Sequence, residues 1–66
     1  MKQIFILQIF DLSLGSSRIA QYAYQTRIGA LRQIAHLQND YAEVDGITLQ
    51  AVYKRYVFNI VPVYVI

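Results

Sequence analysis

The sequence predicts an α+β fold: a three-stranded antiparallel sheet in the order ββα(α)β, with one main helix packed on one face. Three observations predict it. Residues 3–11 are rich in Ile and Phe, the segment after Thr26 has helical period, and residues 57–66 are almost wholly apolar. We expect a single domain over residues 1–66, with the first strand in the middle of the sheet.

The first strand spans residues 3–11 and is apolar on both faces, which is typical of a central strand. Residues 12–17 are rich in Ser and contain Gly15, so they predict a turn. Residues 18–24 form a weaker second strand. The two strands are therefore expected to make an antiparallel hairpin.

The main helix begins after Thr26, a good N-cap residue. Five side chains at helical spacing form its apolar stripe: Ala30, Leu31, Ile34, Leu37 and Tyr41. The opposite face carries Arg32, Gln33, His36 and Asp40. We expect this helix to end between Asn39 and Ala42.

Residues 47–55 fit two structures. Alternation of Ile47, Leu49 and Ala51 suits a strand, whereas Thr48 as N-cap suits a short helix. The Gln, Ala, Lys and Arg in this segment favour the helix. Residues 56–66 then form the last strand. Pro62 cannot donate a ladder hydrogen bond, which places this strand at a sheet edge or at a bulge.

The run from Tyr24 to Leu31 has the pattern Tyr-x-Thr-Arg-x-x-Ala-Leu and follows a hairpin with a Ser- and Gly-rich loop. Over residues 3–42 the chain resembles small uncharacterised ββαβ proteins that are common in bacteriophage genomes. The resemblance implies the same fold and a phage-type origin. It implies no activity, because such proteins mostly have none assigned.

The composition limits how the domain is stabilised. The chain has 66 residues and no Cys, which excludes disulfides and thiolate metal sites. A domain this small is marginal without such links, so 56% hydrophobic residues favour dense packing or oligomerisation. No apolar run reaches the roughly 20 residues that span a bilayer. We expect a cytoplasmic protein without membrane contact or cofactor.

The sequence shows no catalytic motif. His36 and Asp40 are one helical turn apart and are expected to form an exposed pair rather than a site. Asp11, Glu43 and Asp45 lie at a strand end and around a turn, where convergence across a cleft is not expected. We therefore expect a protein that is not an enzyme.

Two sets of residues are candidates for binding. The last strand is apolar on both faces, and we expect it to lie in the interface of a homo-oligomer, most simply a dimer. Its candidate interface residues are Val57, Phe58, Ile60, Val61, Val63, Tyr64 and Ile66. The second set is a candidate nucleic-acid or nucleotide contact, in which Arg18 shares a strand face with two tyrosines. It comprises Arg18, Tyr22, Tyr24, Arg27 and Arg32.

Three functions follow from these features. The first is a small phage-type accessory protein that binds and inhibits a host protein, such as a defence effector. The second is a nucleic-acid or nucleotide-binding oligomer. The third is a structural subunit for which assembly is the activity. Scattered basic residues and a net charge of only +2 favour the first over the second.

Overall fold

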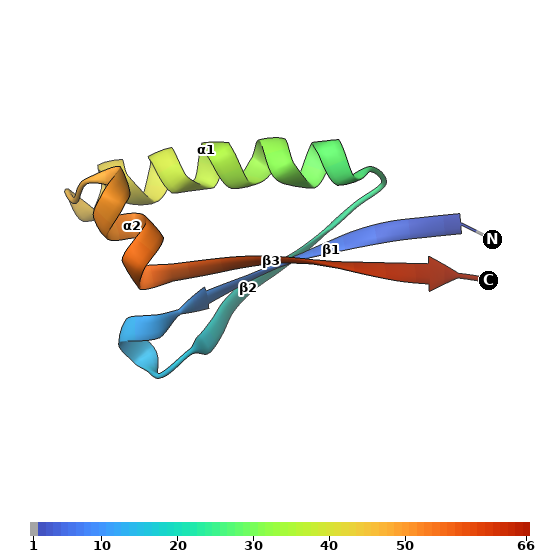
Figure 1. The fold of residues 1–66 in the computed structure, drawn as a ribbon, viewed down its shortest axis with the longest axis horizontal. Coiled ribbons are helices and arrows are strands. Elements are labelled where there is room, and N and C mark those ends of the chain that lie inside the picture. The colour runs from blue at the N-terminus through green and yellow to red at the C-terminus, as the bar shows by residue number, and fades with distance from the viewer. Residues whose placement is uncertain (1) are drawn as a thin grey trace.

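A computed structural model describes residues 2–66 of the chain (Figure 1). Its three strands are β1 (Lys2–Asp11), β2 (Ser17–Tyr24) and β3 (Tyr56–Val65). The two helices are α1 (Arg27–Asp45) and α2 (Leu49–Arg55). The strands form one antiparallel sheet in the order β2-β1-β3, and both helices lie on the same side of it. This confirms the predicted α+β fold and the central position of the first strand.

The hairpin loop contains a single turn of 3-10 helix, η1 (Leu12–Leu14). Asp11 caps this turn, because its side chain accepts a hydrogen bond from the backbone N–H of Ser13 at 2.9 Å. The turn ends at Gly15 with φ of 72°, and Ser16 follows with φ of 63°. The chain reverses direction through these two left-handed residues.

Helix α1 is longer than predicted. It begins as expected, with the Thr26 hydroxyl accepting from the Gly29 N–H at 3.0 Å. The prediction that it ends between Asn39 and Ala42 is wrong, because it continues to Asp45. Gly46, with φ of 66°, ends it in the left-handed conformation that glycine adopts without steric cost.

The ambiguous segment after Gly46 forms α2, which confirms the helical alternative. Thr48 is the N-cap, and its hydroxyl accepts from the Ala51 N–H at 3.2 Å. The helix passes directly into β3 at Tyr56, without a connecting loop. This short second helix covers the end of the sheet that α1 reaches with its last turns.

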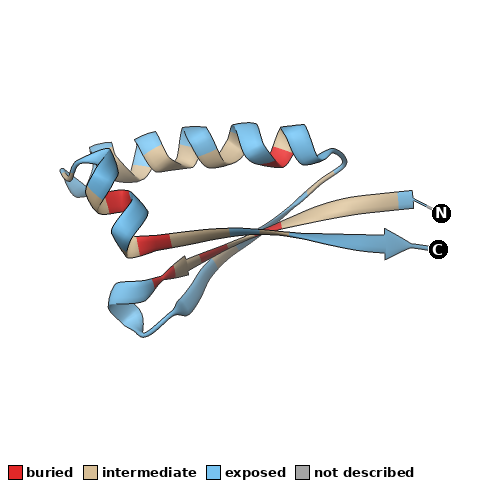
Figure 2. Ribbon diagram, viewed as in Figure 1, coloured by how far each residue is buried: buried red, intermediate tan, exposed pale blue. Residues whose placement is uncertain are grey.

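The core is small and lies between the helices and one face of the sheet (Figure 2). Its buried members are Leu7, Ile9, Val52 and Tyr56. From the predicted stripe of α1, Ala30 is buried and Ile34, Leu37 and Tyr41 pack inward. Leu31 was expected to join them, but it is 50% exposed because it lies at the side of the helix.

The sheet extends beyond the core as a two-stranded ribbon. β2 pairs with β1 only from Phe5 onward, whereas β3 pairs with β1 along its whole length. Lys2 to Ile4 and Val63 to Val65 therefore form a ribbon whose ends carry the two termini (Figure 1). Pro62 lies opposite Phe5 on the edge strand β3, which confirms the edge position that proline predicted.

The molecule is more open than a compact monomer of its size. Its radius of gyration is 12.8 Å, against about 10.8 Å expected for 66 residues. Its accessible surface is 4642 Å², against roughly 4,300 Å² for a compact monomer of this mass. Neither helix described in residues 2–66 is both long enough and apolar enough to cross a membrane.

Candidate interaction surfaces

The structure separates Arg18 from the two tyrosines that were predicted to share its face. Leu7 of β1 pairs with Tyr22, but the register then shifts, so that Phe10 pairs with Arg18 and Ile19 is the extra residue of a bulge. Paired residues lie on the same face, and Leu7 and Phe10 lie on opposite faces. The prediction of a shared face is therefore wrong.

The five candidate nucleic-acid contacts do not form one surface. Tyr22 and Tyr24 lie on the side of the sheet that faces α1, and burial raises the pKa of the Tyr24 phenol. Arg18 lies on the opposite side, where it donates a hydrogen bond to the Gln21 side chain at 2.8 Å. Arg27 and Arg32 are exposed on α1. An aromatic stacking platform bordered by basic groups is not formed by this arrangement.

The seven candidate interface residues of the last strand also divide between the two faces. Phe58 and Ile60 pair with Ile9 and Leu7, so they face the helices and pack against the core. Tyr64 has the same orientation but is 65% exposed in the ribbon. Val57, Val61 and Val63 point to the other side, and Ile66 lies beyond the end of β3.

We call the sheet surface opposite the helices the open face. Its members are Lys2, Ile4, Ile6, Gln8 and Phe10 of β1, Arg18, Gln21 and Ala23 of β2, and Val57, Asn59, Val61, Val63 and Val65 of β3. Within residues 2–66 no helix covers this surface. Its valines remain about two-fifths exposed, at 39% for Val61, 38% for Val63 and 42% for Val65.

Three neutral amides cross the open face in one row. Gln8 pairs with Gln21 of β2 on one side and with Asn59 of β3 on the other. We call these three residues the amide row. Each amide carries both a donor and an acceptor. On either side of the row the face is mostly apolar, and its two ionised side chains, Lys2 and Arg18, lie toward opposite ends of the sheet.

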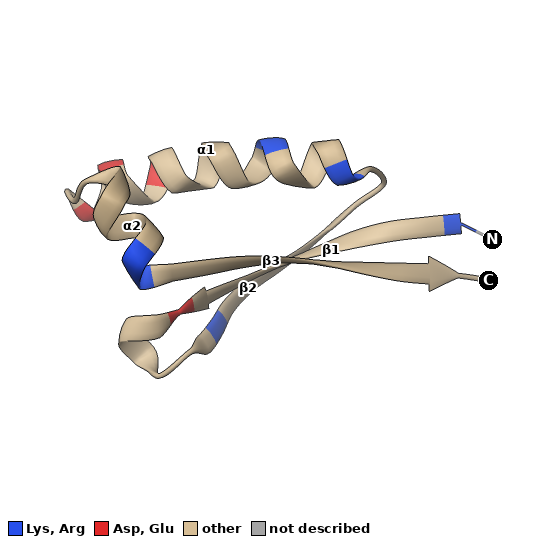
Figure 3. Ribbon diagram, in the orientation of Figure 1, with Lys and Arg blue, Asp and Glu red and all other residues tan. Residues whose placement is uncertain are grey.

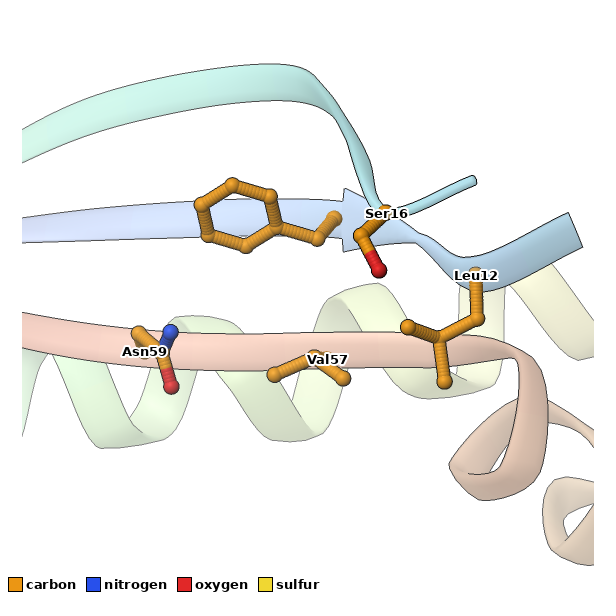
Figure 4. Close-up of a pocket in the computed structure, with 5 residues that line it drawn as sticks. Leu12, Ser16, Val57 and Asn59 are labelled. Carbon is orange, nitrogen blue, oxygen red and sulfur yellow. The ribbon is translucent and has the colours of Figure 1, made fainter. Parts of the chain in front are cut away.

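A shallow hollow lies at the loop end of the open face (Figure 4). Its lining is largely apolar, with a hydroxyl and an amide at the rim: Phe10, Leu12, Ser16, Val57 and Asn59. In Figure 4 these side chains lie on the near side of the strands, with α1 behind them. The hollow is therefore part of the open face and would admit one or two apolar side chains.

A polar cluster lies at the same end of the sheet as the hollow, on the side that faces the helices. Asp11 is 3% exposed and receives a forked pair of hydrogen bonds from Arg55, at 3.3 Å from Nε and 3.1 Å from a terminal nitrogen. Another terminal nitrogen of Arg55 lies 3.7 Å from the Asp45 carboxylate. The Tyr56 hydroxyl donates to that carboxylate at 2.8 Å, and the Arg55 guanidinium lies 5.0 Å from the Tyr56 ring centroid.

This cluster binds the ends of β1, α1 and α2 to the start of β3. Hydrogen bonds from Arg55 and then from Ser13 lower the pKa of Asp11, although its burial acts in the opposite direction. Burial and the bond to Asp45 raise the pKa of Tyr56. The carboxylates of Asp11 and Asp45 were not expected to converge, yet they meet on one arginine. Held in this way, the two carboxylates join the end of β1 to the end of α1 through one arginine.

Only half of this cluster was recognisable from local sequence. Asp11 followed by Ser13 is a local capping pattern that could have been recognised. Arg55 lies 44 residues further along the chain. Nothing in the local pattern indicates that pairing, which arises because α2 returns the chain to the end of β1.

The exposed side of α1 is the second apolar surface. Ile28 is 63% exposed and Leu31 is 50% exposed, three residues apart on the helix. Figure 3 shows basic residues in the first half of α1 and acidic residues toward its end. That distribution opposes the helix dipole, which favours acidic groups at the start and basic groups at the end. His36 and Asp40 are both exposed, as expected, and no ion pair joins them among the residues described.

Comparison of the chain with models of protein families, with curated proteins and with solved structures finds no match.

Proposed function

We propose that the chain is a small, cytoplasmic, non-enzymatic accessory protein that acts by binding other polypeptide chains. One observation carries the proposal. Fourteen large hydrophobic side chains are exposed among the residues described, whereas five hydrophobic residues are buried. Exposed apolar area on this scale is typical of a binding protein, because it weakens a small domain that has no partner.

Two groups of these exposed side chains lie on opposite sides of the molecule. One is on the open face of the sheet, and the other is on α1, in the helix layer, where Ile28 and Leu31 are exposed. Two separate surfaces suit a protein that contacts a copy of itself with one and a different partner with the other. We propose that α1 is the surface that contacts the different partner. Arg27 and Arg32 on α1 favour a partner that carries acidic groups around an apolar contact.

The resemblance to phage ββαβ proteins supports a host protein, such as a defence effector, as the class of partner, and inhibition as the outcome. A purely structural role is the second candidate. It is favoured by the terminal ribbon, which leaves apolar residues exposed on both faces, including Val63 and Tyr64. In that role assembly with other copies would be the activity, and no other protein would be bound.

The test is capture of partners from the native host with the tagged full chain, followed by binding of each purified candidate. In the double variant Ile28→Gln/Leu31→Gln, helix propensity is kept while the apolar contact is removed. We expect its affinity for the partner to fall at least about tenfold. His36→Gln, also exposed on α1, is the matched control and should bind normally.

Three results would count against the proposal. A partner that binds the double variant as well as it binds the wild type contacts another surface. Enrichment of no protein except the chain itself would favour the structural role. Salt-sensitive binding of oligonucleotides would instead favour the nucleic-acid function, which the dispersed positions of Arg18, Tyr22 and Arg27 do not support.

A further inference from the structure

Both edges of the sheet are poor sites for continuing it into a second molecule. On β3 the edge carries Pro62, which has no N–H to donate. On β2 the edge is interrupted by the bulge at Ile19, which disturbs the regular ladder. A partner is therefore expected to approach the open face rather than an edge.

The chemistry of the open face suits an identical surface better than a charged partner. Its central polar groups are the amides of Gln8, Gln21 and Asn59, and an amide can both donate to and accept from another amide. A carboxylate or an ammonium group in the same place would repel its own copy. The only ionised members, Lys2 and Arg18, lie away from the middle of the face.

The two halves of the open face have complementary shapes. The half beyond the amide row contains the hollow at Phe10 and Val57, and the half before it presents the branched side chains of Ile6 and Val61. A two-fold axis along the amide row reverses the strand direction. The amide row of one copy then lies opposite the amide row of the other, while Ile6 lies over Phe10 and Val61 over Val57 of the second copy.

We propose that a second copy of the chain covers the open face, in a two-fold dimer whose axis runs along the amide row. The two sheets pack face to face at about 10 Å, and Gln8 and Asn59 meet their own copies at the centre. The branched side chains of each copy fill the hollow of the other. This inference deepens the proposed function by naming one partner, and it rests on that function only in assuming action through protein contact.

The size of the face predicts a dimer that dissociates on dilution. With the axis at Gln8, only seven residues of β1 overlap their copies, three on either side of Gln8, which is a length of about 23 Å. Three strands are roughly 14 Å wide, so the sheets share a footprint of roughly 320 Å² per copy and bury about 650 Å² in total. Stable interfaces usually bury about 1,200 Å² or more, so we expect a weak dimer with a dissociation constant in the high micromolar range.

The first test measures the mass of the full chain by sedimentation from low to high micromolar concentration, for the wild type and for Gln8→Glu. In the variant two carboxylates would face each other across the axis. We expect the dissociation constant of the dimer to rise at least about tenfold at pH 7. The dimer should form again at about pH 5, where the paired carboxyl groups take up a proton. Gln50→Glu places the same change on exposed α2 and should dimerise normally at both pH values.

The second test uses the absence of native cysteine. Asn59→Cys places one thiol beside the axis, and a short bifunctional maleimide should join two copies efficiently. Val44→Cys, on α1 and 82% exposed, should remain unlinked. Circular dichroism of each variant confirms that it is folded.

Several outcomes would overturn the dimer. A monomer at high micromolar concentration would do so, as would a dimer that Gln8→Glu leaves intact at pH 7. Cross-linking through Val44→Cys but not Asn59→Cys would place the contact elsewhere. None of these outcomes affects binding through Ile28 and Leu31, so failure of the dimer and failure of the proposed function are distinguishable.

Discussion

Replacing Leu7 by alanine removes the most central side chain of the core. Leu7 is 0% exposed and lies in the middle of β1, opposite Tyr22 on one neighbouring strand and Ile60 on the other. Leu-to-Ala changes at buried sites cost about 3 to 5 kcal/mol, because they remove apolar contact and leave a cavity. A domain of this length has about 3 to 10 kcal/mol of total stability. Because this domain buries so few side chains, we expect its stability in the lower half of that range. The Leu7→Ala monomer is therefore expected to be near its unfolding midpoint at 25 °C.

The assay is urea unfolding followed by circular dichroism at two protein concentrations. Only the folded chain presents the open face, so the proposed dimerisation would stabilise the folded chain by mass action, by about 2.7 kcal/mol at a hundred times the dissociation constant. The folded fraction of Leu7→Ala should therefore rise with concentration. Val61→Thr is the matched control: it keeps a branched side chain but lies 39% exposed on the open face. The free energy of unfolding of its monomer should lie within about 0.5 kcal/mol of the wild-type value, and it should rise less with protein concentration than that of the wild type.

Two results would refute the reasoning. A loss below about 1 kcal/mol for Leu7→Ala would mean that the helices do not bury this face of the sheet. A loss for Val61→Thr as large as that for Leu7→Ala at the lower concentration would mean that the two faces are not distinguished as described.

Three further changes test individual features of the fold. The folded pKa of Asp11 is lowered, so its stabilisation is present above the unfolded value near pH 4 and is lost as pH falls through the folded value. The free energy of unfolding of Asp11→Asn should therefore fall less steeply at acid pH than that of the wild type. An unchanged pH dependence would show that the bond to Arg55 does not stabilise the ionised form of Asp11. Gly46→Ala should cost about 1 to 2 kcal/mol in urea unfolding, because φ is 66° there, and a neutral result would contradict the left-handed cap. Glu43→Lys should raise stability by about 0.3 to 1 kcal/mol by reversing an unfavourable charge near the end of α1; a decrease would indicate that Glu43 has a stabilising partner.

Features governed by local sequence were predictable. Thr26 and Thr48 each begin a helix because a hydroxyl satisfies an N–H that the first turn leaves free. The end of α1 was misplaced because Asn39 and Asp40 are weak helix formers, and the packing of Tyr41 on the Tyr56 and Phe58 rings carries the helix past them. Gly46 was the better stop signal.

Features that depend on register or on distant contacts were not predictable. Strict alternation placed Arg18 beside Tyr22, and a single inserted residue at Ile19 reversed that assignment. The pairing of Asp11 with Arg55 depends on the path of the chain through α2. Likewise, β3 is apolar on both faces, so its sequence alone could not show that Phe58 would enter the core and Val57 would not.

The amide row explains how the open face can be exposed to water in the monomer and also pack against a second copy. In water, Gln8 and Asn59 are hydrated, which limits the continuous apolar area of the open face. In the proposed dimer the same groups would bond across the axis and fix which rows meet. Gln8→Leu should therefore strengthen association but remove this fixed register, because any apolar overlap then becomes acceptable. Sedimentation should show species larger than a dimer, and Asn59→Cys cross-linking should lose efficiency in the Gln8→Leu background. A tighter dimer with unchanged cross-linking would mean that the hollow at Phe10, and not the amides, sets the register.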